Sequence, residues 1–501
     1  MSAAPDHDML IIGAGISGIA MAAHMGLVCP ERSYAIFERR EAIGGTWDLF
    51  RYPGVRSDSD MHTLGFVFEP WLHEDAIADG PAILEYLNRT ANERGITPHI
   101  AFNTEVLSAD WDPRTAQWSI TSRKADGKKR VSTARWVHFA SGYYDYDNPH
   151  DAALPGLDQF GGQAVHPQFW PADLDYAGKR VVVIGSGATA VTIVPAMAKK
   201  TASMTMLQRT PTWMASGPRQ DRWNRLFRRW LPAKAAYWLT RQKNIALRSY
   251  FFALSRRNPG KLAAMLRRFL RRDLGPAYAE EHFEPPYAPW RQRLCLVPDG
   301  DLFKAVRSGQ AEVVTDTIAG FDKDGVLLSS GRHLPADIVI TATGLRLVLV
   351  GKVAISVAGK PVDLTEHYFY RGTMFSNLPN LSVVFGYLNA SWTLRADNVA
   401  AYIANVLKQM AARNCRIAMP HLPAGKEPAE VEPFDYTSGY LQRARPMMPK
   451  SGAELPWRLN HNYLMDKADF RNRPVSDGVL LFTNPPAFQE RAPTLAMMTA
   501  R

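Results

Sequence analysis

The sequence predicts an α/β protein with two similar three-layer domains and a helical insertion. An apolar strand followed by a glycine-rich turn and a helix begins near residue 8 and again near residue 180, and a basic stretch with helical periodicity lies between residues 219 and 273. Of the 501 residues, 46% are hydrophobic and 21% are charged, as in an ordinary globular protein. A chain of this length can form roughly two to four domains with a large buried core.

The first unit begins close to the N-terminus. Residues 8–12 predict a strand, residues 16–27 a helix and residues 34–38 a second strand. The apolar run over residues 9–28 is also compatible with a membrane span or a signal peptide. No basic segment precedes it and glycines interrupt it, so a buried strand–turn–helix is favoured. A turn-rich stretch over residues 142–162 predicts a linker to the second unit.

A glycine motif, Gly13-x-Gly15-x-x-Gly18, connects the first strand to the first helix. Such glycines permit a tight turn, close approach of the backbone to a pyrophosphate and close helix packing, and the helix N-terminus supplies free N–H groups. Ser17 adds a hydroxyl to this turn. Glu38 ends the second strand, where a carboxylate accepts hydrogen bonds from ribose hydroxyls and repels a 2′-phosphate. The motif predicts a dinucleotide-binding (Rossmann-like) domain; the alternative is a glycine-rich turn without a ligand.

A second motif of the same kind lies in residues 180–198. Its turn consists of Gly185, Ser186, Gly187, Ala188, Thr189 and Ala190. The next strand ends in Gln208, Arg209 and Thr210 instead of an acid. Arg209 suits a 2′-phosphate through charge-assisted hydrogen bonds, although a solvated arginine is the alternative. Two turns with different endings predict two dinucleotides, FAD on the first and NADPH on the second.

The three cysteines, Cys29, Cys295 and Cys415, lie far apart in the sequence. This spacing predicts neither a disulfide framework nor a metal site, so we expect no metal and a reducing, cytoplasmic location. Disulfide reductases also carry two dinucleotide-binding motifs, but they need a redox pair of nearby cysteines. The absence of such a pair leaves the single-component flavin monooxygenases.

Two further segments resemble signatures of the type I Baeyer–Villiger monooxygenases, which are class B flavoprotein monooxygenases. Residues 45–58 fit the pattern G-x-W-x-x-x-x-Y-P-G-x-x-x-D completely. The pattern F-x-G-x-x-x-H-x-x-x-W-P is matched by Phe160, Gly162, His166, Trp170 and Pro171. The resemblance covers essentially the whole chain. The segments GGTWDLFRYPG and WRQRLCLVPDGDLF are most similar to the ethionamide-activating FAD-containing monooxygenase branch of the family.

This resemblance implies roles for the matched positions. The FAD would be lined by Gly45, Thr46, Trp47, Asp48, Leu49, Arg56, Ser57 and Asp58. Val106 would meet the adenine through its backbone. His166 would be structural or a hinge contact; direct general-base catalysis by this histidine is the less favoured alternative. Trp170 would serve packing.

The resemblance also places a catalytic arginine at Arg293, oriented by Asp58, with Arg291 as its nearest rival. In the family, the residue before the catalytic arginine is often a lysine that helps to hold NADPH. This chain has Gln292 there, so recognition of the 2′-phosphate would depend more on Arg209. The permanently charged guanidinium would stabilise a deprotonated C4a-peroxyflavin and then the oxyanion of its carbonyl adduct.

The implied activity is an FAD- and NADPH-dependent Baeyer–Villiger oxidation, in which O₂ converts small apolar ketones to esters or lactones and also oxidises thioethers. The alternatives are an S/N-heteroatom monooxygenase that rarely attacks ketones, and an uncoupled NADPH oxidase or dinucleotide-binding sensor. The expected domains are an FAD-binding domain over 1–145 and 370–501, an NADPH-binding domain over 150–215 and 290–369, and a helical insertion over 216–289.

The net charge of +11 is concentrated in one segment. Residues 219–273 contain 16 Lys or Arg against 2 acidic residues, a net charge of +14, so the rest of the chain carries −3. No nucleic-acid partner is predicted from so local an excess. Trp, Leu and Phe lie between the arginines, which is consistent with a helix at a membrane surface and a peripheral location. The favoured interpretation is a solvated helical subdomain whose arginines face water or NADPH.

Overall fold

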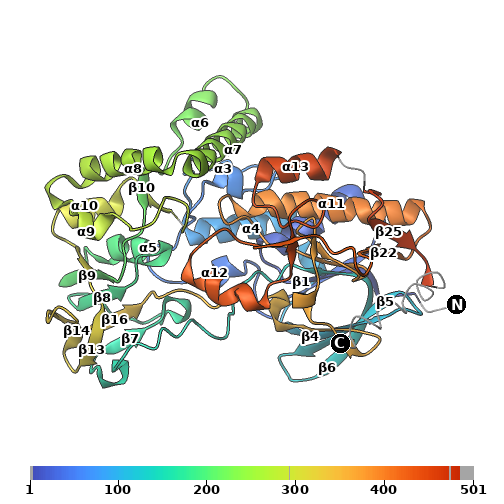
Figure 1. Cartoon of the computed structure of the whole chain (residues 1–501), viewed down its shortest axis with the longest axis horizontal. Coiled ribbons are helices and arrows are strands. Elements are labelled where there is room, and N and C mark those ends of the chain that lie inside the picture. The colour runs from blue at the N-terminus through green and yellow to red at the C-terminus, as the bar shows by residue number, and fades with distance from the viewer. Residues whose placement is uncertain (1–3, 293, 473–474, 486–501) are drawn as a thin grey trace.

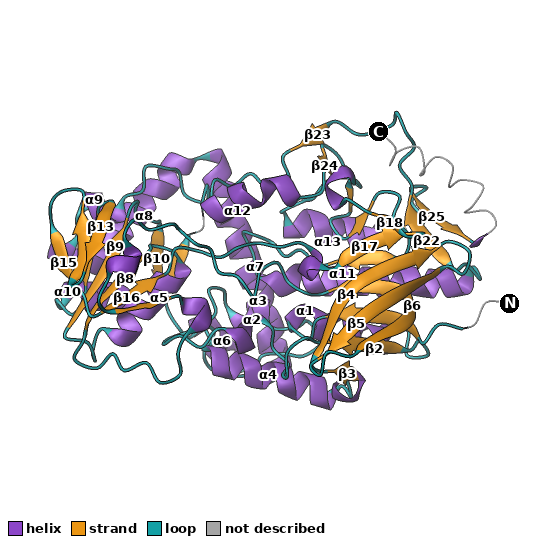
Figure 2. Ribbon diagram, turned by 90° about the horizontal axis from the view of Figure 1, so that it is seen from below, coloured by secondary structure: helices purple, strands orange, loops and turns teal. Residues whose placement is uncertain are grey.

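The computed structural model describes residues 4–292, 294–472 and 475–485. Figure 1 shows an elongated molecule with one group of strands toward each end and helices above and between them. Seen from below in Figure 2, the larger sheet lies at the end that carries the N-terminus, and the five-stranded parallel sheet lies at the other end.

The larger sheet contains, within the described residues, nine strands in the order β18-β17-β4-β5-β6-β1-β2-β3, with β21 also paired to β6. They are β1 (His7–Ile12), β2 (Tyr34–Phe37), β3 (Ile100–Ala101), β4 (Thr104–Asp112), β5 (Gln117–Lys124), β6 (Lys129–Phe139), β17 (Ala354–Val357), β18 (Lys360–Pro361) and β21 (Leu381–Val383). β1 lies parallel between β2 and β6, because its apolar residues Met9 to Ile12 are buried on both faces. β4, β5 and β6 form an antiparallel meander.

Helices cover this sheet and carry the segments that face the first glycine turn. They are α1 (Ile16–Val28), α2 (Thr46–Leu49), α3 (Met61–Leu64), α4 (Gly80–Glu93) and α11 (Trp392–Ala412). α1 and α11 pack against each other in one hydrophobic cluster, although they lie near opposite ends of the sequence. α4 starts where Asp79 accepts a hydrogen bond from the Ala82 N–H and Pro81 occupies the first turn.

The smaller sheet is parallel and has, in the described part of the chain, five strands in the order β12-β9-β8-β16-β7. They are β7 (Gln163–Val165), β8 (Arg180–Ile184), β9 (Ser203–Gln208), β12 (Glu312–Thr315) and β16 (Ile338–Thr341). Helices α5 (Ala188–Met197) and α10 (Asp301–Arg307) pack with it, and β13 (Ile318–Asp322), β14 (Gly325–Leu328) and β15 (His333–Pro335) form a separate small sheet. The second glycine turn joins β8 to α5.

The basic segment forms helices between the paired strands β10 (Met214–Gly217) and β11 (Cys295–Pro298). These are α6 (Arg222–Phe227), α7 (Ala233–Arg257), α8 (Pro259–Leu274) and the short α9 (Glu280–Phe283). Asp221 caps α6 and Asn258 caps α8, so each start is encoded locally. α7 packs against α3, which brings the insertion onto the larger unit.

The C-terminal part is more regular than its sequence indicates. It contains β19 (Phe369–Tyr370), β20 (Met374–Phe375), β22 (Ile417–Pro420), β23 (Glu430–Val431), α12 (Gly439–Ala444), β24 (Ser451–Gly452), α13 (Tyr463–Asn472) and β25 (Leu480–Thr483). These elements are short, and β22 pairs with β25, which lies some 60 residues later in the chain. Their hydrophobic residues therefore form no local periodic pattern that would predict them.

The expected domain division stays a prediction, and we propose one change to it. β17 and β18 are hydrogen-bonded to the larger sheet through β4 and not to the smaller one. Strand pairing therefore favours a boundary between β16 and β17 over the expected boundary at residue 369. The sequence does not show where the chain passes from the smaller sheet to the larger one, because a short strand at a sheet edge has no characteristic sequence pattern.

One buried histidine predicts how stability depends on pH. His138 of β6 is fully buried, its Nδ1 lies 2.8 Å from the Ser382 hydroxyl, and burial lowers its pKa from 6.5 to about 3. Between the two pKa values the imidazole is protonated in the unfolded chain but neutral in the folded chain. The contribution of His138 to stability is therefore fully present above the unfolded pKa of 6.5 and is lost as the pH falls toward 3. We expect the free energy of unfolding in urea to fall by up to about 1.4 kcal/mol per pH unit from this residue below about pH 6. His138→Gln should show a shallower decline; an equal decline would contradict the assignment.

Candidate active site

The first cavity, of about 330 Å³, lies at the carboxyl ends of β1, β2 and β6. Ligands of open α/β sheets bind at such strand ends. The predicted FAD residues that line it are Gly13, Gly15, Ser17, Glu38, Gly45, Thr46, Trp47, Arg56, Ser57, Asp58 and Val106. Gly18, Asp48 and Leu49 were also predicted for FAD but do not line it. The structure thus brings most of these residues together, and their roles toward FAD stay predictions.

The glycine turn is shaped by close backbone contacts. Gly13 has φ +106°, and a Cβ there would lie 2.8 Å from the Ala140 carbonyl oxygen. A Cβ on Gly18 would lie 1.9 Å from the Gly13 carbonyl oxygen, which no side chain can tolerate. Gly18 therefore acts on the packing of α1 against the turn. This explains why the third glycine belongs to the motif without facing the cavity.

Glu38 is buried at the end of β2 and faces the cavity. Its carboxylate accepts hydrogen bonds from the Ala14 N–H at 2.7 Å and the Arg40 N–H at 2.8 Å. Burial raises the pKa of Glu38, while these two donors act in the opposite direction. The carboxylate is thus fixed beside the glycine turn, where it could accept hydrogen bonds from ribose hydroxyls.

The short helix α2 presents Thr46 and Trp47 to the cavity and turns Asp48 away. Asp48 is buried and accepts from Arg40 Nε at 3.0 Å and from Arg51 Nη2 at 2.5 Å. The two guanidinium groups make Asp48 an anchor of the loop, not a cavity-lining group. The family signature does not distinguish a residue that contacts a ligand from one that stabilises a loop, because either requirement can fix the residue at a position.

Arg56, Ser57 and Asp58 follow one another along the cavity wall. Arg56 forms a bidentate ion pair with Asp301, the first residue of α10, which links the two units. The Ser57 N–H donates to the Ala78 carbonyl at 2.8 Å. The Tyr52 hydroxyl nearby is bonded to Thr189 of the second turn, and burial raises its pKa to about 12. This wall therefore joins the first cavity to the second unit.

The predicted catalytic arginine, Arg293, lies outside the described residues. Its rival Arg291 is described, and its Nη1 lies 2.6 Å from Oδ1 of Asp435 in a half-exposed ion pair that Asp435 shares with Arg256. Gln292 lines the second cavity. Arg291 is held by Asp435 and lines neither cavity. The catalytic role of Arg293 stays a prediction.

The second cavity, of about 770 Å³, lies at the carboxyl ends of β8 and β16. The predicted NADP residues that line it are Gly185, Ser186, Gly187, Ala188, Thr189, Arg209 and Thr210. Ala190 does not; it is buried inside α5, where the last position of the motif serves packing. A Cβ on Gly187 would meet no atom within 4 Å, so this glycine leaves its space to the cavity.

Two cations face the second cavity from different elements. Arg209 is exposed at the end of β9, as the sequence predicted. Arg443 of α12 also lines it, and a Cβ on Gly344 would lie 3.8 Å from its Nη2. Sequence reasoning missed Arg443 because α12 reaches the cavity only through tertiary folding. Gly344 follows β16, the strand next to the glycine turn, so Arg443 lies toward the turn.

The linker signature Phe160–Pro171 contributes none of its fixed residues to either cavity. A Cβ on Gly162 would lie 2.3 Å from the Asp337 carbonyl oxygen, so this position is closely packed. His166 accepts a hydrogen bond from the Gln168 N–H at 3.2 Å, and burial lowers its pKa. The Gln168 side chain donates to the Asp145 carbonyl at 2.8 Å. These contacts support a structural role for His166, as the resemblance implies.

The two cavities adjoin. Tyr144, Ala188, Thr189 and Leu345 line both of them. The first cavity is also lined by Tyr144, Lys352 and Trp392, which come from later parts of the chain and were not predicted from the sequence. The Trp392 N–H donates to the Ser17 hydroxyl at 2.7 Å, and Lys352 lies 2.5 Å from Asp145. No sequence motif marks these residues, because they meet the glycine turn only through the fold.

No group of three or more His, Cys, Asp or Glu side chains in the part of the chain that the structure covers could hold a metal ion. No helix among the same residues is long and apolar enough to cross a bilayer.

Comparison with known proteins agrees with this geometry. The family described as flavin-binding monooxygenase-like matches residues 70–257, and the NAD(P)-binding Rossmann-like domain matches residues 11–74. Among solved structures, a steroid monooxygenase bound to NADP has a TM-score of 0.75 at 21% identity, covering 95% of this chain and 99% of that chain. An open form of cyclohexanone monooxygenase has a TM-score of 0.73 at 20% identity, with the same two coverages. These two likenesses show the fold.

Curated relatives are much closer in sequence. The FAD-containing monooxygenase EthA of Mycolicibacterium smegmatis is 47% identical over 479 residues, covering 95% of this chain and 97% of the relative. The probable FAD-binding monooxygenase AlmA of Acinetobacter baylyi is 44% identical over 476 residues, covering 95% of this chain and 96% of the relative. The chain belongs to the flavin-binding monooxygenase family and is close to its EthA-type FAD-containing members.

Proposed function

We propose that this protein is an FAD- and NADPH-dependent Baeyer–Villiger monooxygenase that converts small apolar ketones to esters or lactones with O₂ and also oxidises thioethers. The observation that supports this most is the pair of adjoining cavities, one beside the carboxylate of Glu38 and the other beside the guanidinium of Arg209. One chain then holds both the hydride donor and the flavin. The two complete family signatures favour Baeyer–Villiger chemistry over other flavin oxidations.

The residues of both cavities fit the two dinucleotides. FAD, when bound, accepts the hydride and activates O₂. Gly13 and Gly15 let the backbone approach its pyrophosphate, and Glu38 accepts from its ribose. Gly187 leaves room for the pyrophosphate of NADPH, and Arg209 pairs with its 2′-phosphate. The shared wall of the cavities brings the two ligands together.

Arg293 and Asp58 carry the proposed catalytic step. The guanidinium of Arg293 stabilises the negative charge that develops on the substrate carbonyl oxygen, because it stays protonated at every working pH. Asp58 on the cavity wall orients that guanidinium. Tyr52, whose pKa is raised by burial, stays a neutral hydroxyl on the wall of the first cavity and adds no negative charge there.

The second candidate is an S/N-heteroatom monooxygenase. The similarity to the EthA-type members favours sulfur oxidation, because the resemblance is to an ethionamide-activating branch. Both reactions use the same cofactors and the same cavities. They differ in whether a carbonyl carbon or a sulfur lone pair meets the activated oxygen. An uncoupled NADPH oxidase is less favoured, since the cavity wall retains Asp58 and the complete signatures.

The proposal is tested by identifying products. The purified yellow protein would be given NADPH, O₂ and a panel of linear, cyclic and aryl ketones plus a thioether, with products identified by mass spectrometry. Ester or lactone formed in proportion to NADPH supports the proposal. Sulfoxide without ester moves the assignment to the heteroatom monooxygenase, and hydrogen peroxide alone across the panel contradicts oxygen transfer to these substrate classes.

The proposal includes a cytoplasmic location with peripheral contact to a membrane through residues 219–273. Small apolar substrates dissolve in lipid, so an enzyme at a membrane surface meets them at higher concentration. We propose no nucleic-acid partner.

A further inference from the structure

We propose that the helical insertion carries a membrane-contact patch that seats the enzyme on an anionic lipid surface. The patch consists of the exposed apolar side chains of α6, the turn after it and α7: Trp223, Leu226, Trp230, Leu231, Trp238, Leu239, Leu247 and Tyr250. Lipid binding by this patch does not depend on the reaction catalysed. Only its consequence, the delivery of apolar substrates, rests on the proposed function.

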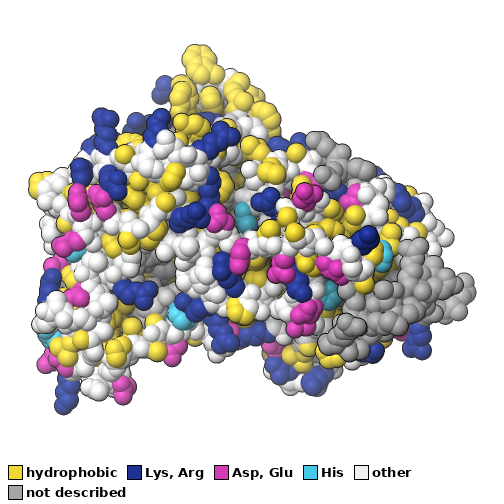
Figure 3. Space-filling view, viewed as in Figure 1, with side chains coloured by type: hydrophobic (Ala, Val, Ile, Leu, Met, Phe, Trp, Pro, Cys, Tyr) yellow, Lys and Arg dark blue, Asp and Glu magenta, His cyan; other side chains and the backbone are white. Residues whose placement is uncertain are grey.

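The patch is unusually exposed for residues of this size. Trp230 is 82% exposed, Tyr250 59%, and Trp223 and Trp238 56% each. Figure 3 shows hydrophobic side chains gathered on the projection that carries α6 in Figure 1, with Lys and Arg gathered below them. Single exposed apolar residues are common, but a contiguous group that includes three tryptophans marks an interaction site. Tryptophan prefers the interface between lipid and water, where its ring is apolar and its N–H stays hydrated.

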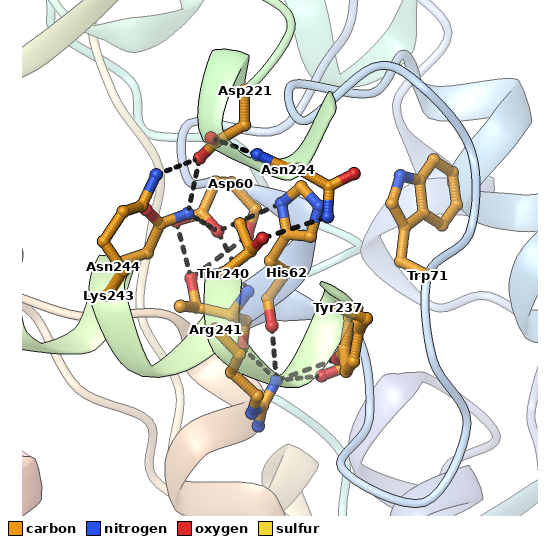
Figure 4. A network of polar contacts seen from close by, with 12 residues as sticks. Asp60, His62, Trp71, Asp221, Asn224, Tyr237, Thr240, Arg241, Lys243 and Asn244 are labelled. Atoms are coloured by element: carbon orange, nitrogen blue, oxygen red, sulfur yellow. Dashed lines mark hydrogen bonds and ion pairs between the residues drawn. The ribbon is translucent and has the colours of Figure 1, made fainter. Parts of the chain in front are cut away.

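The polarity of α7 is reversed relative to an ordinary surface helix. Its outward face carries Ala235, Trp238, Leu239, Ala246 and Tyr250, which follow helical spacing. Its opposite face buries the polar side chains of Thr240, Arg241 and Asn244 together with Ala236, Tyr237 and Ile245. Figure 4 shows Arg241 directed toward His62 and Tyr237, and Asn244 directed toward Asp60. Thr240 meets the side chain of Asn224. Surface helices of globular proteins bury their apolar face, so the outward apolar face of α7 calls for a partner.

The buried polar face explains how this reversal is stable. Arg241 Nη1 donates to the carbonyls of His62 and Gly65, each at 2.7 Å, and thereby satisfies the end of α3. Asn244 donates to the Asp60 carboxylate at 2.9 Å, which caps the start of α3. Both ends of α3 are thus bonded to one face of α7. The reversal is thus fixed by the contacts of Arg241 and Asn244 with α3. Arg241 is buried and departs from the expectation that the arginines of this segment face water or NADPH, whereas Arg222, Arg225 and Arg229 are exposed.

The charge around the patch selects an anionic surface. From Arg222 to Arg272 the sequence contains no Asp or Glu. Arg222, Arg225, Arg229 and Lys234 are exposed among the tryptophans, and none of the four has an ion pair within the described part of the chain. Basic residues beside interfacial aromatic residues attract anionic headgroups, and the attraction weakens with salt.

A second copy of the chain is disfavoured as the occupant. A two-fold interface would place the same patch on itself and bring its unpaired cations against one another. The patch also projects from the molecule, whereas the energetically important residues of protein interfaces occupy fitted pockets. A fluid bilayer accepts a projecting apolar tip and supplies the opposite charge.

The patch is coupled to the candidate site by a short path. α3 starts at Met61, three residues after Asp58, which lines the first cavity, and α7 is bonded to both ends of α3. Docking of α7 on lipid would therefore set the orientation of this cavity wall relative to the membrane. The partner inferred is an anionic bilayer, and the substrates delivered are apolar compounds dissolved in it.

The test is co-sedimentation of the full-length flavin-loaded protein with vesicles of phosphatidylcholine alone or mixed with phosphatidylglycerol. We expect binding to the mixed vesicles that weakens as salt is raised. The double variant Trp230→Ser, Trp238→Ser should bind about tenfold more weakly, and Arg225→Gln, Arg229→Gln should lose the preference for anionic lipid. The matched control Leu464→Ser, Met465→Ser changes two exposed apolar residues of α13 and should bind as the wild type does.

Flavin absorbance and NADPH oxidation with a water-soluble ketone report folding separately, and both should stay unchanged in the patch variants. If the wild type ignores both kinds of vesicle, or if the patch variants bind as well as the wild type, the patch assignment is wrong. Sedimentation velocity without lipid supplies a further contrary outcome: a dimer that the tryptophan variant dissociates would assign the patch to a second copy. Absence of ester with intact vesicle binding would overturn the proposed reaction and leave the patch standing.

Discussion

Replacing Arg293 by alanine is expected to abolish ester formation while leaving flavin binding intact. Removing a preorganised donor to a developing oxyanion lowers kcat by about 10²–10³. Because hydride transfer from NADPH does not require a charge at the carbonyl, NADPH oxidation should continue and release hydrogen peroxide. The measurement is the ratio of ester formed to NADPH consumed, with flavin absorbance as the check that the variant is folded.

Arg291→Ala is the matched control for this prediction. Its guanidinium is half exposed and bound to Asp435, so its removal should change the coupling ratio by less than about twofold. If Arg291→Ala loses ester formation and Arg293→Ala keeps it, the catalytic role belongs to Arg291. Asp58→Asn should fall between the two, since it removes the charge that we propose to orient the arginine but leaves the guanidinium in place.

Arg209→Gln is expected to weaken NADPH binding by about 10- to 100-fold and to leave NADH binding almost unchanged. The loss corresponds to a charge-assisted hydrogen bond to the 2′-phosphate, worth about 1.5–3 kcal/mol. NADH lacks that phosphate, so it does not sense the change. The measurement is the dependence of anaerobic flavin reduction on coenzyme concentration, followed by stopped-flow absorbance for both coenzymes.

Arg443→Gln separates recognition of the 2′-phosphate from general attraction of the coenzyme. Arg443 lines the same cavity from α12, close to Gly344 and the glycine turn. We expect it to weaken NADPH and NADH by similar factors, because both carry the pyrophosphate. If Arg443→Gln weakens the binding of NADPH but not of NADH, Arg443 and not Arg209 recognises the 2′-phosphate. An unchanged affinity of Arg209→Gln for NADPH would support the same conclusion.

The sequence predicted the features that depend on contiguous residues. A glycine turn, the strand before it and the helix after it form one local unit, so Gly13, Gly15 and Gly187 were found from spacing. Glu38 and Arg209 were found because each ends the strand that follows its turn. The lack of a cysteine pair excluded the disulfide reductases, and two complete signatures indicated the family to which the sequence comparisons assign the chain.

Some positions that match a motif serve packing and not the cavity. Gly18, Asp48 and Ala190 fulfil the patterns, yet each acts behind the cavity wall through backbone contact, ion pairs or helix burial. A pattern records which residue a position requires and does not record whether the reason is a ligand or a neighbour. Only atomic distances separate the two.

By itself the sequence determined the two dinucleotide turns, the charges that end them, the family and the presence of a basic helical insertion. Tertiary structure alone decided that Arg443 and Trp392 reach the cavities, that Arg291 is held by Asp435, and that α7 turns its polar face inward. The physical reason is the range of the interactions. Turn geometry and helix starts are fixed by neighbours within a few residues, whereas these contacts join residues a hundred or more positions apart, whose meeting depends on how the whole chain packs.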